Sequence, residues 1–308
     1  MGTIDLRTQI RDFLSTRRAR ITPEQAGLPA YGGNRRVAGL RREEVAMLAG
    51  VSVDYYVRME RGSLTGVSES VLDALAEALR LDEAERAHLL ALAAAAGPAR
   101  TRRVRAAATS VRAPVRQVLE AMTEAPAWVR NARHDILAMN ELARALYAPV
   151  LAADPRRPAN ATRFTYLCEA AAREFFVDYD RIARDAAAML RLEAGRSPND
   201  KALIELVGEL STRSDLFRRQ WASQDVKLHR SGQKRLRHPV VGRLDLDYES
   251  MELASEPGHV LNVYTAATGT PAADALRLLA SWAATQEAAT QEAAAQRPAR
   301  AADTEETP

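Results

Sequence analysis

Apolar residues recur at helical spacing through the first third of the chain. The first stripe has a period of 3.6 residues and predicts an amphipathic helix over 4–20. Its members are Ile4, Leu6, Ile10, Phe13 and Leu14. Ser68 and Asp82 stand where N-caps are expected, and Gly97-Pro98 ends the pattern. The predicted helices are 4–20, 41–49, 53–61, 68–81 and 83–97, and they predict an all-α domain over 1–96.

From Pro114 onward the pattern alternates between helical and strand periods. The predicted helices are 114–124, 140–147, 178–194, 200–210, 212–223 and 271–284. The predicted strands are 127–130, 136–139, 226–229, 234–237, 243–248 and 260–265. They predict an α+β domain over 114–285, with an antiparallel sheet and with helices inserted between its early and late strands. The Arg-rich stretch 97–113 lacks an apolar stripe and is expected to be a linker. The polar, Ala-rich tail 286–308 is expected to be disordered.

Charge is distributed unevenly along the 308 residues. Residues 1–113 hold 18 Arg and 13 Asp or Glu, a net charge of +5, whereas the remainder holds 25 basic and 27 acidic residues, a net charge of −2. A basic first domain suits contact with nucleic acid. The single cysteine, Cys168, excludes an internal disulfide, and the five histidines lack metal-ligand spacing, so no cofactor or metal is expected. With no apolar run long enough to cross a membrane, we expect a cytoplasmic protein.

The segment 42–62 has the sequence form of a helix-turn-helix. Gly50 supplies the backbone angles of the turn, and Ser52 is placed to cap the second helix. Ala46 is small where two helices cross closely. Tyr56 and Met59 fall three residues apart and are expected to face the core. A plain helical hairpin would share part of this pattern, but the joint match favours DNA binding.

The outer face of the second helix carries the residues that we predict to contact base edges. Arg58 is suited to donate two hydrogen bonds to guanine, Asp54 to accept one from cytosine, and Val53 to pack on a thymine methyl group. Contacts with phosphates that set the register are expected from a second group. Its members are Arg35, Arg36, Arg41, Arg42, Ser52, Tyr55 and Arg61.

Residues 39–56, Gly-Leu-Arg-Arg-Glu-Glu-Val-Ala-Met-Leu-Ala-Gly-Val-Ser-Val-Asp-Tyr-Tyr, resemble the Xre/lambda-repressor-like helix-turn-helix family. More narrowly, they are similar to the MmyB-like transcriptional regulators of high-GC bacteria, as is the preceding loop that ends in Arg35-Arg36. Over 114–280, the stretches 129–140, 221–226 and 231–239 resemble the MmyB-like ligand-binding domain. The resemblance implies a PAS-like fold, an antiparallel sheet with helices over one face and a small-molecule pocket between them.

The same resemblance implies an apolar anion, such as a fatty acid, as ligand. On that basis the candidate ligand contacts are Asn140, Trp221, Arg237 and His238, and family members often carry His where this chain has Gln224. From spacing alone, the basic strand 234–238 is more typical of a solvated surface than of an anion site.

Three functions follow from these patterns. The preferred one is a homodimeric transcriptional regulator that binds double-stranded operator DNA and senses a small molecule, because helix-turn-helix proteins gain specificity from two half-sites. The second is a DNA-binding adaptor whose second domain binds a protein. The third is a DNA-targeted enzyme, and the absence of a nucleophile–base pattern argues against it. Cys168 lies in an apolar segment that is more typical of a core thiol than of a nucleophile.

Overall fold

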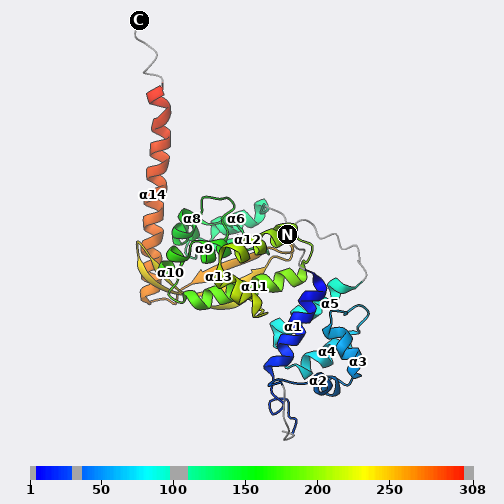
Figure 1. Ribbon diagram of the computed structural model, residues 1–308. Coiled ribbons are helices and arrows are strands. Elements are labelled where there is room, and N and C mark those ends of the chain that lie inside the picture. The colour runs from blue at the N-terminus through cyan, green and yellow to red at the C-terminus, as the bar shows by residue number, and fades with distance from the viewer. Residues whose placement is uncertain (1–4, 30–36, 98–109, 302–308) are drawn as a thin grey trace. The chain divides into compact units, whose positions relative to one another are not determined.

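The computed structural model describes residues 5–29, 37–97 and 110–301 (Figure 1). Contacts between residues divide the chain into two compact units. The first unit comprises residues 1–107, 165–167 and 180–229, and the second comprises 108–164, 168–179 and 230–308. No helix of the described residues is long and apolar enough to cross a membrane.

Five helices at the start of the chain form the predicted all-α region. Their bounds are α1 (Leu6–Arg20), α2 (Arg42–Leu48), α3 (Val53–Glu60), α4 (Glu69–Ala78) and α5 (Glu83–Ala96). Side chains cap most of them, as the sequence predicted. Ser68 Oγ accepts the amide of Val71, and Asp82 and Glu85 form a reciprocal capping box at the start of α5.

Three later helices belong to the same unit for most or all of their length. They are α11 (Tyr179–Arg196), α12 (Lys201–Arg213) and α13 (Asp215–Ala222). The apolar stripe of α1 packs in a core that also contains Leu192 of α11 and Val226. Helix α11 and the segment after α13 therefore share a hydrophobic core with the helix-turn-helix region.

The second unit is built around a five-stranded antiparallel sheet in the order β2-β1-β5-β4-β3. Its strands are β1 (Ala127–Arg130), β2 (Ile136–Met139), β3 (Ser231–His238), β4 (Gly242–Glu252) and β5 (Val260–Thr265). Its helices are α6 (Ala113–Ala121), α7 (Glu141–Leu146), α8 (Ala148–Ala153), α9 (Ala161–Leu167, shared with the first unit), α10 (Glu169–Phe175) and α14 (Pro271–Ala301). The predicted combination of an all-α region and an α+β domain with an antiparallel sheet is confirmed.

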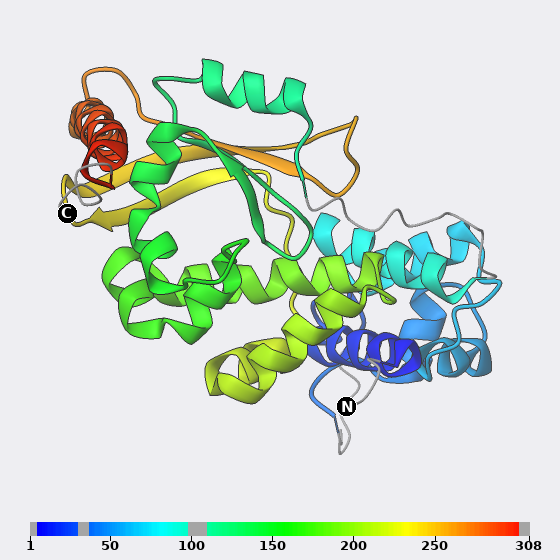
Figure 2. The same ribbon diagram turned by 90° about the horizontal axis from the view of Figure 1, so that it is seen from above.

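The two faces of the sheet have different partners. Ala127 and Val129 point to the face on which Leu119 of α6 packs. Trp128 and Arg130 alternate with them and therefore point to the opposite face. Figure 2 shows α6 along one face and the helices between β2 and α11 along the other.

Three sequence predictions differ from the observed elements. Residues 226–229 form no strand, because the amide of Lys227 donates to the carbonyl of Ala188 on α11 and Val226 is buried in the core of the first unit. The short helices α8, α9 and α10 were not predicted, since each is stabilised by tertiary packing rather than by an apolar period. Helix α14 extends to Ala301 instead of ending near 284, and its Ala- and Glu-rich composition favours this helix. The rest of the predicted disordered tail, 302–308, lies outside the described residues, as does most of the predicted linker.

Candidate nucleic-acid interface and ligand-binding domain

The turn between α2 and α3 has the backbone geometry that the sequence predicted. Gly50 has φ +64°, a left-handed conformation that glycine adopts without a steric penalty. The amide of Val51 donates to the carbonyl of Ala46 at 2.9 Å and closes the end of α2. Ala46 is buried in the core, so its small side chain allows the two helices to approach closely.

Helix α3 begins at a side-chain cap and presents two distinct faces. Ser52 Oγ accepts the amide of Tyr55 at 3.2 Å. Tyr56 and Met59 are fully buried. Residues 53, 54 and 58 are exposed on the outer face. The predicted division of this helix is confirmed, whereas base contacts by Val53, Asp54 and Arg58 stay a prediction.

The arginines around α2 and α3 differ in their partners. Arg41, Arg58 and Arg61 are exposed, and none of them forms an ion pair with a described residue. The guanidinium carbon of Arg58 lies 4.8 Å from the ring centroid of Tyr55, a cation–π contact that orients Arg58 on the surface. Their charge is therefore available to phosphates or bases. Residues 35 and 36, two further predicted contacts, lie outside the described residues.

A buried carboxylate joins α1, α2 and α3 of the DNA-binding region. Glu60 is 2% exposed, and its Oε1 accepts from Arg18 Nε at 2.6 Å and from the hydroxyl of Tyr56 at 3.4 Å. Its other oxygen accepts from Nε of Arg42. Burial raises the pKa of Tyr56 and, less strongly, so does the charge of Glu60. The sequence analysis did not identify Glu60 or Arg18, since a single acid on an amphipathic helix looks like an ordinary surface residue.

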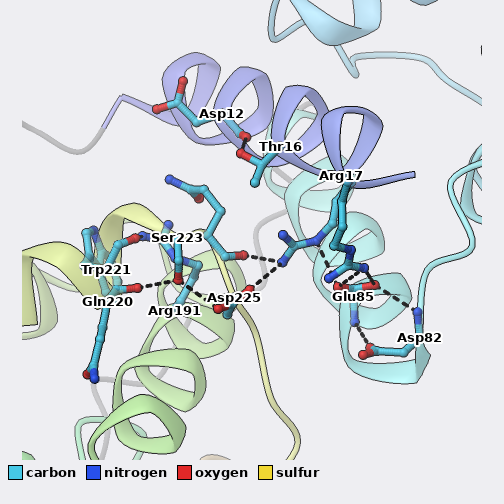
Figure 3. Close-up of polar contacts among 12 residues, drawn as sticks. Asp12, Thr16, Arg17, Asp82, Glu85, Arg191, Gln220, Trp221, Ser223 and Asp225 are labelled. Carbon is cyan, nitrogen blue, oxygen red and sulfur yellow. Dashed lines mark hydrogen bonds and ion pairs between the residues drawn. The ribbon is translucent and has the colours of Figure 1, made fainter. Parts of the chain in front are cut away.

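A second buried ion cluster lies between α1, α5 and the segment after α13 (Figure 3). Arg17 on α1 is 1% exposed. Its Nε lies 2.9 Å from Glu85, an Nη2 hydrogen is donated to the carbonyl of Gln224, and Asp225 lies 3.9 Å away. Glu85 also accepts from Arg20 at 2.7 Å. Because Arg17 bonds the carbonyl of residue 224, this contact does not depend on the identity of that side chain.

Helix α11 approaches α5 closely at a glycine. A Cβ atom at Gly195 would lie 2.5 Å from Cε1 of His88, closer than real contacts allow. Nearby, Arg191 is 3% exposed, stacks 3.9 Å from the ring of Trp221 and donates to the carbonyl of that residue. Burial, together with the charges of Arg191 and Arg17, lowers the pKa of His88 to about 3. His88 is therefore neutral in the folded protein.

Of the four predicted ligand contacts, Trp221 belongs to the first unit and the other three belong to the second. Asn140 caps α7 and uses its whole amide on backbone groups. Its Oδ1 accepts from Ala127 and Ala143, and its Nδ2 donates to the carbonyls of Met122 and Ala125. Asn140 therefore acts as a structural link between α6, β1 and α7.

The two candidates on β3 are neighbours in the strand and therefore point to opposite faces. His238 is buried, with Nε2 3.0 Å from the carbonyl of Ala145 and Nδ1 accepting the amide of Val240. Both ring nitrogens are thus occupied by backbone groups, and burial lowers the pKa of His238. Arg237 is exposed and lies 3.5 Å from the carbonyl of Glu174.

Cys168 and the histidines belong to no cluster of metal ligands in the described part of the chain. Cys168 is half-buried between α9 and α10, with Sγ 3.5 Å from the carbonyl of Ala153. No group of three or more His, Cys, Asp or Glu residues among those described could hold a metal ion.

A capped recognition helix, exposed arginines around it and a separate α+β domain define a helix-turn-helix DNA-binding regulator. Two family models match the chain. Residues 14–89 match a helix-turn-helix domain, and residues 111–279 match the ligand-binding domain of MmyB-like transcription regulators. The second match covers more than half of the 308 residues, so the chain belongs to the MmyB-like transcription regulators. No curated protein gives a significant match.

The protein is therefore a DNA-binding transcription regulator with a ligand-binding domain, and its family is one of regulators rather than of enzymes. The match to a ligand-binding domain favours a small-molecule ligand over the adaptor function. The match spans helices α11–α13, which pack with the DNA-binding helices in one compact unit.

Proposed function

We propose that this protein is a one-component regulator in which an apolar or anionic ligand, such as a fatty acid, controls affinity for an operator. The observation that carries the proposal is the ion cluster around Arg17. It joins the helix-turn-helix region to residues 224 and 225, which lie within the matched ligand-binding domain. Part of the matched ligand-binding domain therefore packs in one compact unit with the helix-turn-helix region.

Loss of the buried ion pair between Arg17 and Glu85 would destabilise the folded protein. Removal of one partner from a buried ion pair typically destabilises a protein by about 3–5 kcal/mol. Arg17 and Glu85 are both almost completely buried. Residues 180–229 are thus expected to move together with α1 and α5. A ligand that favours one arrangement of these residues would shift the population of DNA-binding conformations by the difference in its affinity for the two arrangements.

We further propose that the protein acts as a homodimer. A single helix-turn-helix unit contacts one half-site, and two units about 34 Å apart read both halves of an operator. Sedimentation velocity at micromolar concentration, with and without operator DNA, tests this expectation. A monomer under both conditions would contradict it.

The proposal of ligand control is tested in two steps. Native mass spectrometry of the purified chain is expected to show a dimer that carries a small molecule. After the molecule is removed, fluorescence anisotropy on DNA selected from a random library measures affinity with and without the extracted compound. We expect at least about a tenfold change in Kd, or 1.4 kcal/mol. Equal affinities would refute control by this ligand.

A matched pair of glycine variants tests whether the packing of α11 against α5 transmits the signal. Gly195→Ala places a Cβ against His88, whereas Gly97→Ala places one 3.5 Å from the nearest atom, an ordinary contact. We expect Gly195→Ala to reduce the change in DNA affinity that the ligand causes, and Gly97→Ala to preserve it. An identical response in both variants would exclude this route.

A further inference from the structure

The last turn of α1 is held on two sides by segments that are far apart in the sequence. Arg17 and Arg18 are consecutive residues in this turn. Consecutive positions of an α-helix differ in direction by about 100°, so their side chains leave the helix on different sides. Arg17 points toward the turn after α13, residues 223–226, and donates to the carbonyl of Gln224 (Figure 3). Arg18 instead reaches the segment that leads into α2.

Arg18 fixes the start of α2 through two contacts. Its Nη1 donates to the carbonyl of Leu40 at 2.9 Å, and the amide of Leu40 donates to the carbonyl of Arg18 at 3.1 Å. Its Nε donates to Glu60, the buried carboxylate that also binds Arg42. Leu40 is fully buried and lies two residues before Arg42. The position of Arg42 therefore depends on Arg18 through both the backbone and the carboxylate.

A glycine lets the segment before α2 lie directly against the backbone of α1. Gly39 is buried, and a Cβ atom at this position would overlap the carbonyl oxygen of Ala19. Such close packing of two backbones leaves no side chain between them that could adjust to a displacement. A shift of the last turn of α1 is therefore expected to move the start of α2 with it.

The turn that Arg17 binds has a strained backbone. Gln224 has φ +60°, a left-handed conformation that a residue with a side chain keeps only when its surroundings hold it. Its buried Oε1 has no hydrogen-bond partner among the described residues, so the side chain does not stabilise this conformation. Two buried guanidinium groups bind the backbone instead. Arg17 binds the carbonyl of Gln224, and Arg191 binds the carbonyl of Trp221.

We propose that Arg17 and Arg18 are positioning residues for DNA binding, through which the 223–226 turn sets the position of Arg42. Arg17 is 1% exposed and acts without touching DNA. It fixes the last turn of α1, and Arg18 passes that position on to the start of α2. The proposal rests on the proposed function in that the 223–226 turn lies in the matched ligand-binding domain. A ligand that changes this turn would alter DNA affinity by this route.

A purely structural role for Arg17 is the competing explanation, since a buried arginine paired with a carboxylate is destabilising to remove. The two explanations differ in the salt dependence of DNA binding. Partial unfolding lowers the concentration of active protein but leaves the number of phosphate contacts in each bound molecule unchanged. Displacement of Arg42 removes one contact, so the plot of log K against log salt concentration becomes less steep.

The test is a double-mutant cycle on the full chain, with fluorescence anisotropy on selected operator DNA at several salt concentrations. Arg42→Ala should reduce the salt slope by about 1. Arg17→Met should reduce it by a similar amount, although Arg17 is buried. The double variant should bind no more than about twofold more weakly than Arg42→Ala alone, because the contact that Arg17 positions is already absent.

Arg20→Met is the matched control for Arg17→Met. Arg20 lies in the same helical turn and binds the same carboxylate, Glu85, at 2.7 Å. Its contact lies on the α5 side of α1 rather than at the 223–226 turn. Arg20→Met should therefore keep the salt slope of the unaltered protein, and its effect on affinity should add to that of Arg42→Ala.

A second pair of variants leaves the arginines in place. Gln224→Val disfavours the left-handed conformation because its side chain is β-branched, whereas Gln224→Gly adopts that conformation without strain. We expect the salt slope of Gln224→Val to be lower than that of Gln224→Gly by about 1. Circular dichroism checks that each variant is folded, and this pair decides the question if Arg17→Met fails to fold.

Any of four results would overturn the proposal. They are additive losses for Arg17→Met and Arg42→Ala, an unchanged salt slope for folded Arg17→Met, an unchanged slope for Arg42→Ala, and equal slopes for the two Gln224 variants. Failure of this route and failure of ligand control remain distinguishable. If Arg17 and Arg42 are coupled but an extracted ligand leaves DNA affinity constant, the positioning role stands and ligand control fails. If the ligand changes DNA affinity but the cycle is additive, ligand control stands and this route fails.

Discussion

Glu60 on α3 binds the guanidinium group of Arg42 at the start of α2. Glu60 is buried, whereas the side chain of Arg42 is 52% exposed. This hydrogen bond, together with the charge of Glu60, raises the pKa of Arg42. The inner part of the arginine is thus fixed by the core, and its outer edge is available to a DNA phosphate. Arg18 binds the other side of the carboxylate group.

We expect Glu60→Gln to lower both the stability and the DNA affinity of the protein. The substitution preserves shape but removes the charge that holds Arg18 and Arg42, which should cost about 1–3 kcal/mol of unfolding free energy. Urea unfolding and DNA binding at one salt concentration measure the two effects. Glu43→Gln, at an exposed position on α2, should change stability by no more than about 0.5 kcal/mol. Lower stability with unchanged DNA affinity in folded protein would show that Glu60 does not position Arg42.

Arg58→Ala should weaken binding to the selected operator by about 1–3 kcal/mol and relax base preference at one position. The reason is its place on the exposed face of α3, where its contact with Tyr55 orients the guanidinium group. Binding to selected and random DNA in the same buffer measures this difference. Arg86→Ala, an arginine paired with Asp73, serves as the control. An equal loss on both DNAs would assign Arg58 to phosphates instead.

Arg41→Ala should weaken binding to all sequences alike. Its exposed side chain has no ion pair with a described residue, so its charge is free to neutralise a phosphate. Loss of one phosphate contact should reduce the slope of log K against log salt concentration by about 1. Titrations between 50 and 200 mM salt, roughly the range over which such slopes are measured, provide the value. An unchanged slope would remove Arg41 from the interface.

The lowered pKa of His88 leads us to expect that the free energy of unfolding decreases on acidification. Its pKa is lowered from 6.5 to about 3 in the folded state. Unfolded chains therefore take up a proton below about pH 6.5 that the folded protein refuses, so the stabilisation present above pH 6.5 declines as the pH falls toward 3. The contribution is up to about 1.4 kcal/mol for each pH unit in that window.

Urea unfolding at several pH values tests the expected decrease in the free energy of unfolding. The range from about pH 7 to 4.5 covers roughly the upper part of the interval in which His88 differs in protonation between the folded and unfolded states. The His88→Gln variant should show a smaller pH slope than the unaltered protein. His134 and His238, whose pKa values are also lowered, contribute equally to both proteins and cancel in the comparison. His229→Gln, at a half-buried histidine, is the matched control. Equal slopes for His88→Gln and the unaltered protein would mean that the fold does not lower the pKa of His88.

The features that were predicted correctly from the sequence depend on interactions between residues close together in the chain. The turn at Gly50, the cap at Ser52 and the spacing of Tyr56 and Met59 each depend on neighbours within one or two helical turns. The alternation of Lys234 and Arg237 on β3 is likewise a local property of a strand. These features can therefore be predicted from the sequence without knowledge of the tertiary contacts.

The sequence by itself thus determined the helix-turn-helix, its exposed face and the α+β class of the second domain. Only the tertiary structure decided which side chains became occupied or available. Backbone groups occupy the hydrogen-bonding atoms of Asn140 and His238. Trp128, Tyr147 and Lys234 come from separate elements, and the indole N–H of Trp128 has no hydrogen-bond partner among the described residues. Burial removes water as a hydrogen-bond partner. Whether a buried polar group is hydrogen-bonded therefore depends on residues that lie far away in the sequence. No local pattern contains that information.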